Sequence, residues 1–93
     1  MNPIIQILQQ HKEELFKKYP LKSMALFGSY SRGEETKDSD VDVMVELSIP
    51  DGMAFIRLSH ELEEIIKIKV DLVSKGGVKE RYMRAIENDL LYV

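Results

Sequence analysis

Residues 27–46 read Phe-Gly-Ser-Tyr-Ser-Arg-Gly-Glu-Glu-Thr-Lys-Asp-Ser-Asp-Val-Asp-Val-Met-Val-Glu, and the rest of the chain is interpreted outward from this segment. Gly28 and Gly33 bracket a turn that carries hydroxyl groups and an arginine. Asp40 and Asp42 begin a valine-rich strand, and because strand side chains alternate between faces, both carboxylates point the same way. Two like charges this close repel each other, which favours a bound divalent cation such as Mg²⁺.

The composition indicates one small α/β domain spanning residues 1–93, with a single thin core that association with another chain would help. The net charge of −3 argues against a broad electrostatic grip on nucleic acid, so we expect no direct nucleic-acid partner. Cysteine is absent, which excludes disulfides and thiolate metal sites. We see no signal peptide and no membrane-crossing run, and therefore expect a cytoplasmic protein.

The spacing of apolar residues, prolines and glycines predicts a series of helices and strands. The first helix begins at Pro3 with Asn2 as its N-cap and ends before Pro20. The predicted elements that follow are strand 21–27, a helical turn from residue 29, strand 40–47, helix 53–68 capped by residue 51 or 52, strand 69–73, helix 78–90 and an apolar tail to residue 93.

The connections predict how these elements are arranged. The link between strands 21–27 and 40–47 is too short for a parallel crossover, so this pair should be antiparallel or steeply splayed. The link to strand 69–73 contains a whole helix and can be a parallel crossover. We therefore expect a three-stranded mixed sheet packed with helices. The apolar tail either folds back on the sheet or forms part of an interface, and the sequence leaves both open.

A third acid lies on the last predicted strand. Asp71 stands between Val70 and Leu72, in a segment whose other residues favour burial. Placed beside Asp40 and Asp42, it would complete a three-carboxylate cluster of the kind that holds two divalent ions for in-line displacement at phosphorus. Two structural alternatives remain open. Asp40 and Asp42 could be solvent-facing charges on an edge strand, and a lysine or arginine could pair with Asp71.

The glycine-bounded turn supplies the complementary part of such a site. Gly28 allows the backbone to approach a ligand closely, and the Ser29 hydroxyl with the amides of the turn can cradle phosphate oxygens. Arg32 lies one turn further on and could neutralise phosphate charge, although an isolated arginine is more often a surface residue.

Together these motifs resemble those of a known family. The order is Gly28-Ser29-x-x-Arg32-Gly33, then Ser39-Asp40-x-Asp42, then Asp71 in a later apolar strand. It is similar to the DNA polymerase β-like nucleotidyltransferase superfamily. Within that superfamily, the short length and the spacing resemble the minimal nucleotidyltransferases (MNT-domain antitoxins), which are the antitoxin partners of HEPN-domain toxins. The resemblance covers nearly the whole chain.

The resemblance implies specific roles for the acids. Asp40 and Asp42 would bind Mg²⁺, as a pair of ions, and Asp71 would complete the site and help to activate the attacking hydroxyl. For the remaining motif residues, it implies that Gly28 and Ser29 hold the triphosphate of ATP.

Arg32 and Ser39 would be further contacts to the nucleotide. The resemblance also implies a reaction and a partner. The family members most similar to this chain transfer AMP from ATP to a tyrosine of the cognate HEPN ribonuclease and so silence it. No second substrate-binding module follows in this sequence, which favours a protein substrate presented by a partner.

Two other functions remain compatible with the sequence. The chain could be an antitoxin that neutralises its partner by binding alone, without catalysis. Alternatively, it could be the nucleotidyltransferase subunit of an enzyme that modifies a small molecule. Nucleic-acid polymerisation is the least expected function, because the chain is acidic and too small to hold a template.

Overall fold

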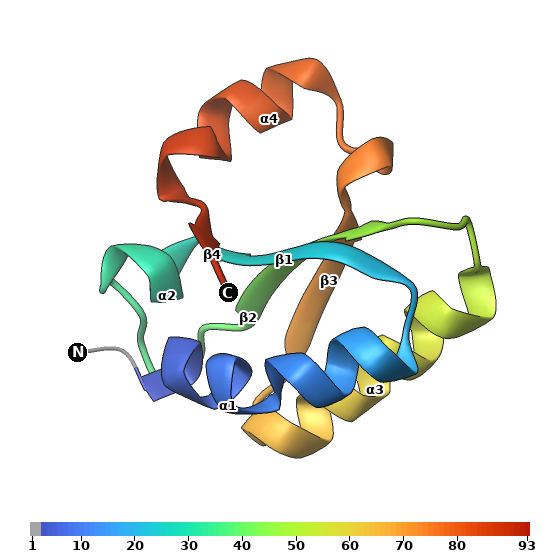
Figure 1. The fold of residues 1–93 in the computed structure, drawn as a ribbon. Helices are drawn as coiled ribbons and strands as arrows, with labels where there is room; N and C mark the ends of the chain where they lie inside the picture. Colours follow the sequence, from blue (N-terminus) through green and yellow to red (C-terminus); the bar gives the residue numbers. More distant parts are fainter. Residues whose placement is uncertain (1–2) are drawn as a thin grey trace.

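The helices and strands follow one another in nearly the predicted order (Figure 1). The computed structural model describes residues 3–93, so Asn2, the expected N-cap of the first helix, lies outside the described residues. The elements are α1 (Pro3–Lys18), β1 (Leu21–Phe27), α2 (Ser29–Arg32), β2 (Val41–Leu47), α3 (Gly52–Ile66), β3 (Val70–Ser74), the 3-10 turn η1 (Lys75–Gly77), α4 (Glu80–Ile86), the 3-10 turn η2 (Glu87–Asp89) and β4 (Leu91–Tyr92).

Local sequence signals explain where the helices begin and end. Helix α1 stops before Pro20, as expected from the steric restriction on the residue that precedes a proline. Helix α3 is capped by Asp51, whose carboxylate accepts a hydrogen bond from the Ala54 amide at 3.1 Å. The last predicted helix is shorter than expected, because α4 ends at Ile86 and passes into η2.

The sheet is mixed, with strand order β3-β2-β1-β4. Strands β1 and β2 pair antiparallel, as the short link between them predicts. Strands β2 and β3 pair parallel, with α3 forming the crossover between them, which is also as predicted. This leaves β3 as an edge strand, bonded to β2 only.

The predicted strand number was wrong, because the sheet has four strands. The apolar tail folds back on the sheet as β4, where Leu26 pairs with Leu91 and Ala25 with Tyr92. The Val93 amide extends this pairing by donating to the Met24 carbonyl at 2.9 Å. A strand of two residues is too short to show alternation, so its sequence pattern could not distinguish the two outcomes left open.

The two faces of the sheet are covered unequally. Helices α1 and α3 lie over one face and α4 lies over the other (Figure 1). The α1/α3 face buries Val41, Val43 and Val45 completely, together with Leu8, Leu15, Leu58 and Leu62. The α4 face has a smaller cluster, formed by Phe27, Met44 and Ile86. Most of the buried apolar residues therefore lie on the α1/α3 face.

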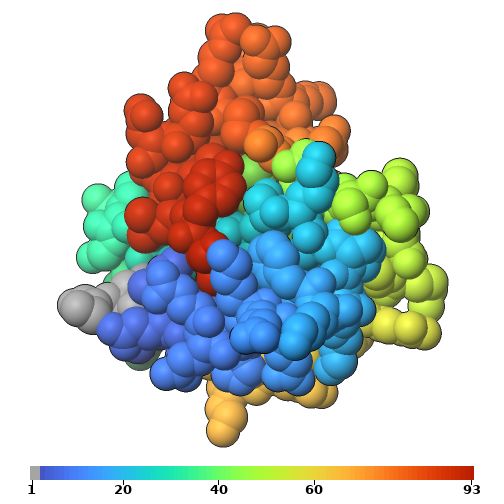
Figure 2. Space-filling view, in the orientation of Figure 1, coloured from blue at the N-terminus to red at the C-terminus, as the bar shows by residue number. Residues whose placement is uncertain are grey.

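The C-terminal residues lie where these parts meet. In the space-filling view they are red, between α1 in blue and the α4 segment in orange (Figure 2). Within residues 3–93, none of the helices has the length and apolar character needed to cross a membrane.

Candidate active site

Two carboxylates stand side by side on the α4 face of the sheet. Asp42 is half-buried and points away from the face that buries its neighbours Val41 and Val43. In the parallel pairing of β2 with β3, Asp42 lies directly opposite Asp71. Asp71 acts on Asp42 through its charge and through a side-chain hydrogen bond, and both raise the pKa of Asp42.

The charge concentrated at this point shifts the titration of Asp42. Burial first, and then the charges of Asp71 and Asp40, together raise the pKa of Asp42 to about 6, and the charge of Arg32 opposes them. Burial is the largest cause, and the neighbouring negative charges add to it. A divalent cation would relieve the repulsion between these carboxylates.

The other two predicted ligands are more exposed than Asp42. Asp40 lies just before β2, where its charge acts on Asp42. Asp71 is exposed because β3 is an edge strand, so the expectation that its segment favours burial fails at this residue. Within residues 3–93, no lysine or arginine forms an ion pair with Asp71, which argues against the basic-partner alternative.

The arrangement and the chemistry of the acids decide whether they fit Mg²⁺. As the side chains stand in residues 3–93, no three or more His, Cys, Asp or Glu groups form a set that could hold a metal ion. Asp42 and Asp71 face each other across the strand pairing, and with the nearby charge of Asp40 they are a hard-oxygen donor set of the type that Mg²⁺ prefers. The donors therefore fit the ion chemically, while a three-carboxylate ligand set stays a prediction.

The predicted phosphate-binding turn lies directly against Asp42. Gly28 adopts φ 75° and ψ −153°, a conformation that favours glycine. A Cβ at Gly28 would overlap Oδ2 of Asp42 and come within 3.0 Å of its Cγ. Gly28 is therefore required both by its backbone angles and by its carboxylate neighbour.

Helix α2 is held to this turn by hydrogen bonds. The Ser31 hydroxyl donates to the Gly28 carbonyl at 2.9 Å, and the amides of Ser31 and Arg32 donate to the same oxygen at 3.1 and 3.2 Å. Ser29 is the first residue of α2. The structure thus places Gly28 beside Asp42, with Ser29 next along the chain, and their contact with a triphosphate stays a prediction.

Arg32 and Ser39, the further predicted contacts, are engaged within the protein. The Arg32 guanidinium forms ion pairs with Glu34 and Asp89, each at 2.8 Å. The hydrogen bonds to Glu34 and then Asp89 raise the pKa of Arg32. The Ser39 hydroxyl accepts from the Thr36 amide at 2.9 Å and closes the turn that leads into β2.

Sequence reasoning missed Asp89 altogether. It lies in η2, far along the chain from Arg32, and reaches it only because β4 brings the C-terminal segment back to β1. No local motif marks it, since the two-residue strand that positions it gave no signal. Asp89 links the predicted phosphate-binding turn to the C-terminal segment.

Comparison with known proteins identifies the class that this fold and site define. The model of the nucleotidyltransferase domain family matches residues 8–93. The chain belongs to the nucleotidyltransferase domain family, and its fold is the mixed-sheet α/β fold of that family.

Two curated relatives match over almost their whole length. MJ0128 of Methanocaldococcus jannaschii, which bears the name of a protein adenylyltransferase, is 46% identical over 95 residues, covering 100% of this chain and 97% of the relative. Protein adenylyltransferase MntA of Thermococcus cleftensis is 37% identical over 94 residues, covering 100% of this chain and 95% of the relative.

Two solved structures show the same fold. One described as a minimal nucleotidyltransferase superposes with a TM-score of 0.76 at 26% identity, covering 92% of each chain. The other is a toxin–antitoxin complex with AMP-PNP, with a TM-score of 0.63 at 28% identity, covering 76% of this chain and 60% of that chain. The similarity therefore includes a structure that was determined with an ATP analogue.

Proposed function

We propose that this nucleotidyltransferase is a Mg²⁺-dependent protein adenylyltransferase. It transfers AMP from ATP to the hydroxyl group of a tyrosine on a partner HEPN-domain toxin, and thereby acts as the antitoxin. The observation that carries the proposal is the placement of Asp42 opposite Asp71 and against Gly28. The names of the curated relatives and the AMP-PNP complex of the structural neighbour support the nucleotide and the protein acceptor.

The residues of the chain divide the binding work in this proposal. Asp40, Asp42 and Asp71 hold the metal ions, which, when bound, neutralise phosphate charge and lower the pKa of the acceptor hydroxyl. Gly28, which lies against Asp42, and Ser29, which follows it at the start of α2, hold the triphosphate oxygens.

The reaction itself is an in-line displacement at the α-phosphorus. The acceptor oxygen forms a bond to that phosphorus, the bond to the bridging oxygen of pyrophosphate breaks, and pyrophosphate leaves. In this proposal Asp71, which is exposed on the edge strand β3, accepts the proton of the acceptor hydroxyl. The chain contributes chiefly positioning and electrostatic stabilisation.

The test is transfer of label from α-³²P-ATP to the partner. The purified pair is incubated with Mg²⁺, and the partner is analysed for radioactivity and for the added mass of AMP. We expect labelling by the wild type, and none by the double variant Asp40→Asn with Asp42→Asn. Asp38→Asn is the matched control, because Asp38 lies in the turn 36–39 and its side chain is exposed.

The same assay separates the alternatives. Label that appears on a small molecule and never on protein would identify a small-molecule nucleotidyltransferase. If the double variant transfers no label and the partner nevertheless stays inhibited, the chain neutralises its partner by binding alone. Either result, or full labelling by the double variant, would contradict the proposal.

A further inference from the structure

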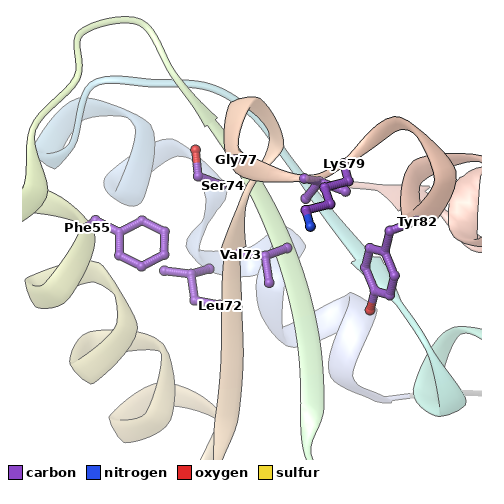
Figure 3. Close-up of a pocket in the computed structure, with 8 residues that line it drawn as sticks. Phe55, Leu72, Val73, Ser74, Gly77, Lys79 and Tyr82 are labelled. Carbon is purple, nitrogen blue, oxygen red and sulfur yellow. The ribbon is translucent and has the colours of Figure 1, made fainter.

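A groove runs along the free edge of β3. It has a volume of about 520 Å³ and is lined by residues that include Phe55, Leu72, Val73, Val78, Lys79 and Tyr82. Figure 3 shows Phe55 and Leu72 on one side of β3, and Val73, Lys79 and Tyr82 on the other. The groove therefore surrounds the strand that also carries Asp71, one residue before Leu72.

The backbone groups at this edge can accept another strand. The Val41 amide donates a hydrogen bond to the Lys69 carbonyl. Backbone groups alternate in direction along a strand, so the N–H and C=O groups of Asp71 and Val73 point toward β2, and those of Leu72 and Ser74 point outward. The outward amide of Val70 is already occupied by the Glu63 carboxylate at 2.9 Å.

The free part of the edge coincides with the groove. Over residues 3–93 the structure shows no partner for the outward amides of Leu72 and Ser74, and both residues line the groove. An exposed strand edge of this kind is a template for an added strand. The position that Glu63 occupies limits the addition to the part of β3 that follows Asp71.

The charge and the position of the groove indicate what binds there. Among the basic residues of the segment 75–84, Lys79 lines the groove, and no ion pair of Lys79 is seen in residues 3–93. Lys75 and Arg84 are paired with Glu46 and Glu80. The charge of Lys79 favours an acidic segment, and the apolar walls favour aromatic or aliphatic side chains.

Strand geometry connects the groove to the chemistry. A strand added to β3 lies about 4.8 Å away, and its side chains alternate between the two faces as those of β3 do. A side chain on the α4 face of the added strand, level with the start of the free edge, would therefore stand beside Asp71.

We propose that this groove, named here the β3-edge groove, binds an extended acidic segment of the protein substrate as an added strand, and so delivers its acceptor hydroxyl to Asp71. This inference rests on the proposed transfer to protein and names the surface that selects the acceptor. The β3-edge groove acts on acceptor binding, while ATP binding depends on the Gly28 turn.

Two substitutions test the edge and the charge separately. Ser74→Pro removes an outward amide hydrogen, and Ser74 already has φ −92° and ψ 131°, close to values that proline adopts. Ser74→Ala keeps the amide hydrogen and separates its loss from loss of the hydroxyl. Lys79→Glu reverses the groove charge, and Arg81→Glu is its matched control, since Arg81 lies on the same segment but lines a different surface with Arg84 and Ala85.

The measurement is steady-state AMP transfer to the HEPN-domain partner, with the full chain of each variant and a thermal melt to confirm folding. We expect Ser74→Pro and Lys79→Glu each to raise the KM for the protein acceptor by about tenfold and to leave the KM for ATP unchanged. Ser74→Ala and Arg81→Glu should change the acceptor KM by less than about twofold.

Other results would overturn the inference. Unchanged acceptor KM in both Ser74→Pro and Lys79→Glu would exclude the groove as the acceptor site. A variant that alters the mass of the chain in solution, with unchanged acceptor KM, would show that the edge binds a second copy instead. Absence of transfer by the wild type would instead refute the proposed function, so the two failures can be told apart.

Discussion

The two faces of the sheet use the same strands for opposite purposes. On the α1/α3 face, β2 contributes Val41, Val43 and Val45, all completely buried. On the α4 face, the same strand contributes Asp42, which repels Asp71 across the strand pairing. Alternation along one strand thus places the stabilising residues and the proposed metal-binding residue one position apart.

This difference shows where stability is gained and where it is lost. The apolar face supplies burial, which is the dominant favourable contribution to folding. The carboxylate face holds like charges together and costs free energy when no cation is bound. Substitutions on the two faces should therefore affect stability and activity in opposite ways.

The largest effect should come from Asp71→Asn. Loss of this carboxylate removes a proposed metal ligand and the acceptor of the hydroxyl proton. AMP transfer should fall by about a thousandfold, while the melting temperature of the metal-free protein stays the same or rises. Transfer rates and thermal melts on the same samples check this. If the variant keeps more than a tenth of the wild-type transfer rate, AMP transfer does not depend on the Asp71 carboxylate.

The opposite pattern is expected for Leu58→Ala, on the apolar face. Leu58 is 0% exposed, and its truncation should cost about 2–5 kcal/mol of unfolding free energy. Well below its melting temperature, the variant should keep the wild-type KM for ATP. Ile56→Ala on the same helix is the control, because Ile56 is 52% exposed and should change stability by less than about 0.5 kcal/mol. Equal destabilisation by both would contradict the burial argument.

Gly28→Ala should lower both stability and activity. Its backbone angles, φ 75° and ψ −153°, cost a residue with a Cβ about 1–3 kcal/mol, and the added Cβ would displace the Asp42 carboxylate. We expect a lower melting temperature and AMP transfer reduced by about tenfold or more. Gly76→Ala is the matched control, since a Cβ there meets nothing within 4 Å. Wild-type activity in Gly28→Ala would separate the turn from the site.

The smallest effect concerns the pH dependence of the metal-free protein. Because the folded-state pKa of Asp42 is raised to about 6 from 3.8, this group stabilises the fold fully below about pH 4. That contribution is lost as the pH rises through 6. Asp42→Asn should therefore melt higher than the wild type at pH 7.5, and the difference should shrink toward pH 4. Parallel melting curves across this range would contradict the assigned charge repulsion.

Most of the fold could be predicted because its signals are local. Pro20, the Asp51 cap and the short β1–β2 link each fix a boundary or a direction by themselves. Strand β4 could not be predicted, because two residues carry no period and their pairing with β1 is a tertiary choice.

The candidate site was predictable in content and less so in geometry. The residue types and spacing led to Asp42, Asp71 and Gly28, but the register that sets Asp42 opposite Asp71 depends on the length and packing of the α3 crossover. The ion pair of Arg32 with Asp89 depends on β4 and left no trace in the sequence pattern. Contacts between distant segments are the part that only the folded chain provides.

A crystal structure of the chain with Mg²⁺ and a non-hydrolysable ATP analogue would test the division of the two faces most directly. The account predicts metal density bounded by Asp40, Asp42 and Asp71, with the triphosphate against Gly28 and Ser29. Nucleotide bound elsewhere on the molecule, or metal density that excludes Asp42 and Asp71, would contradict it.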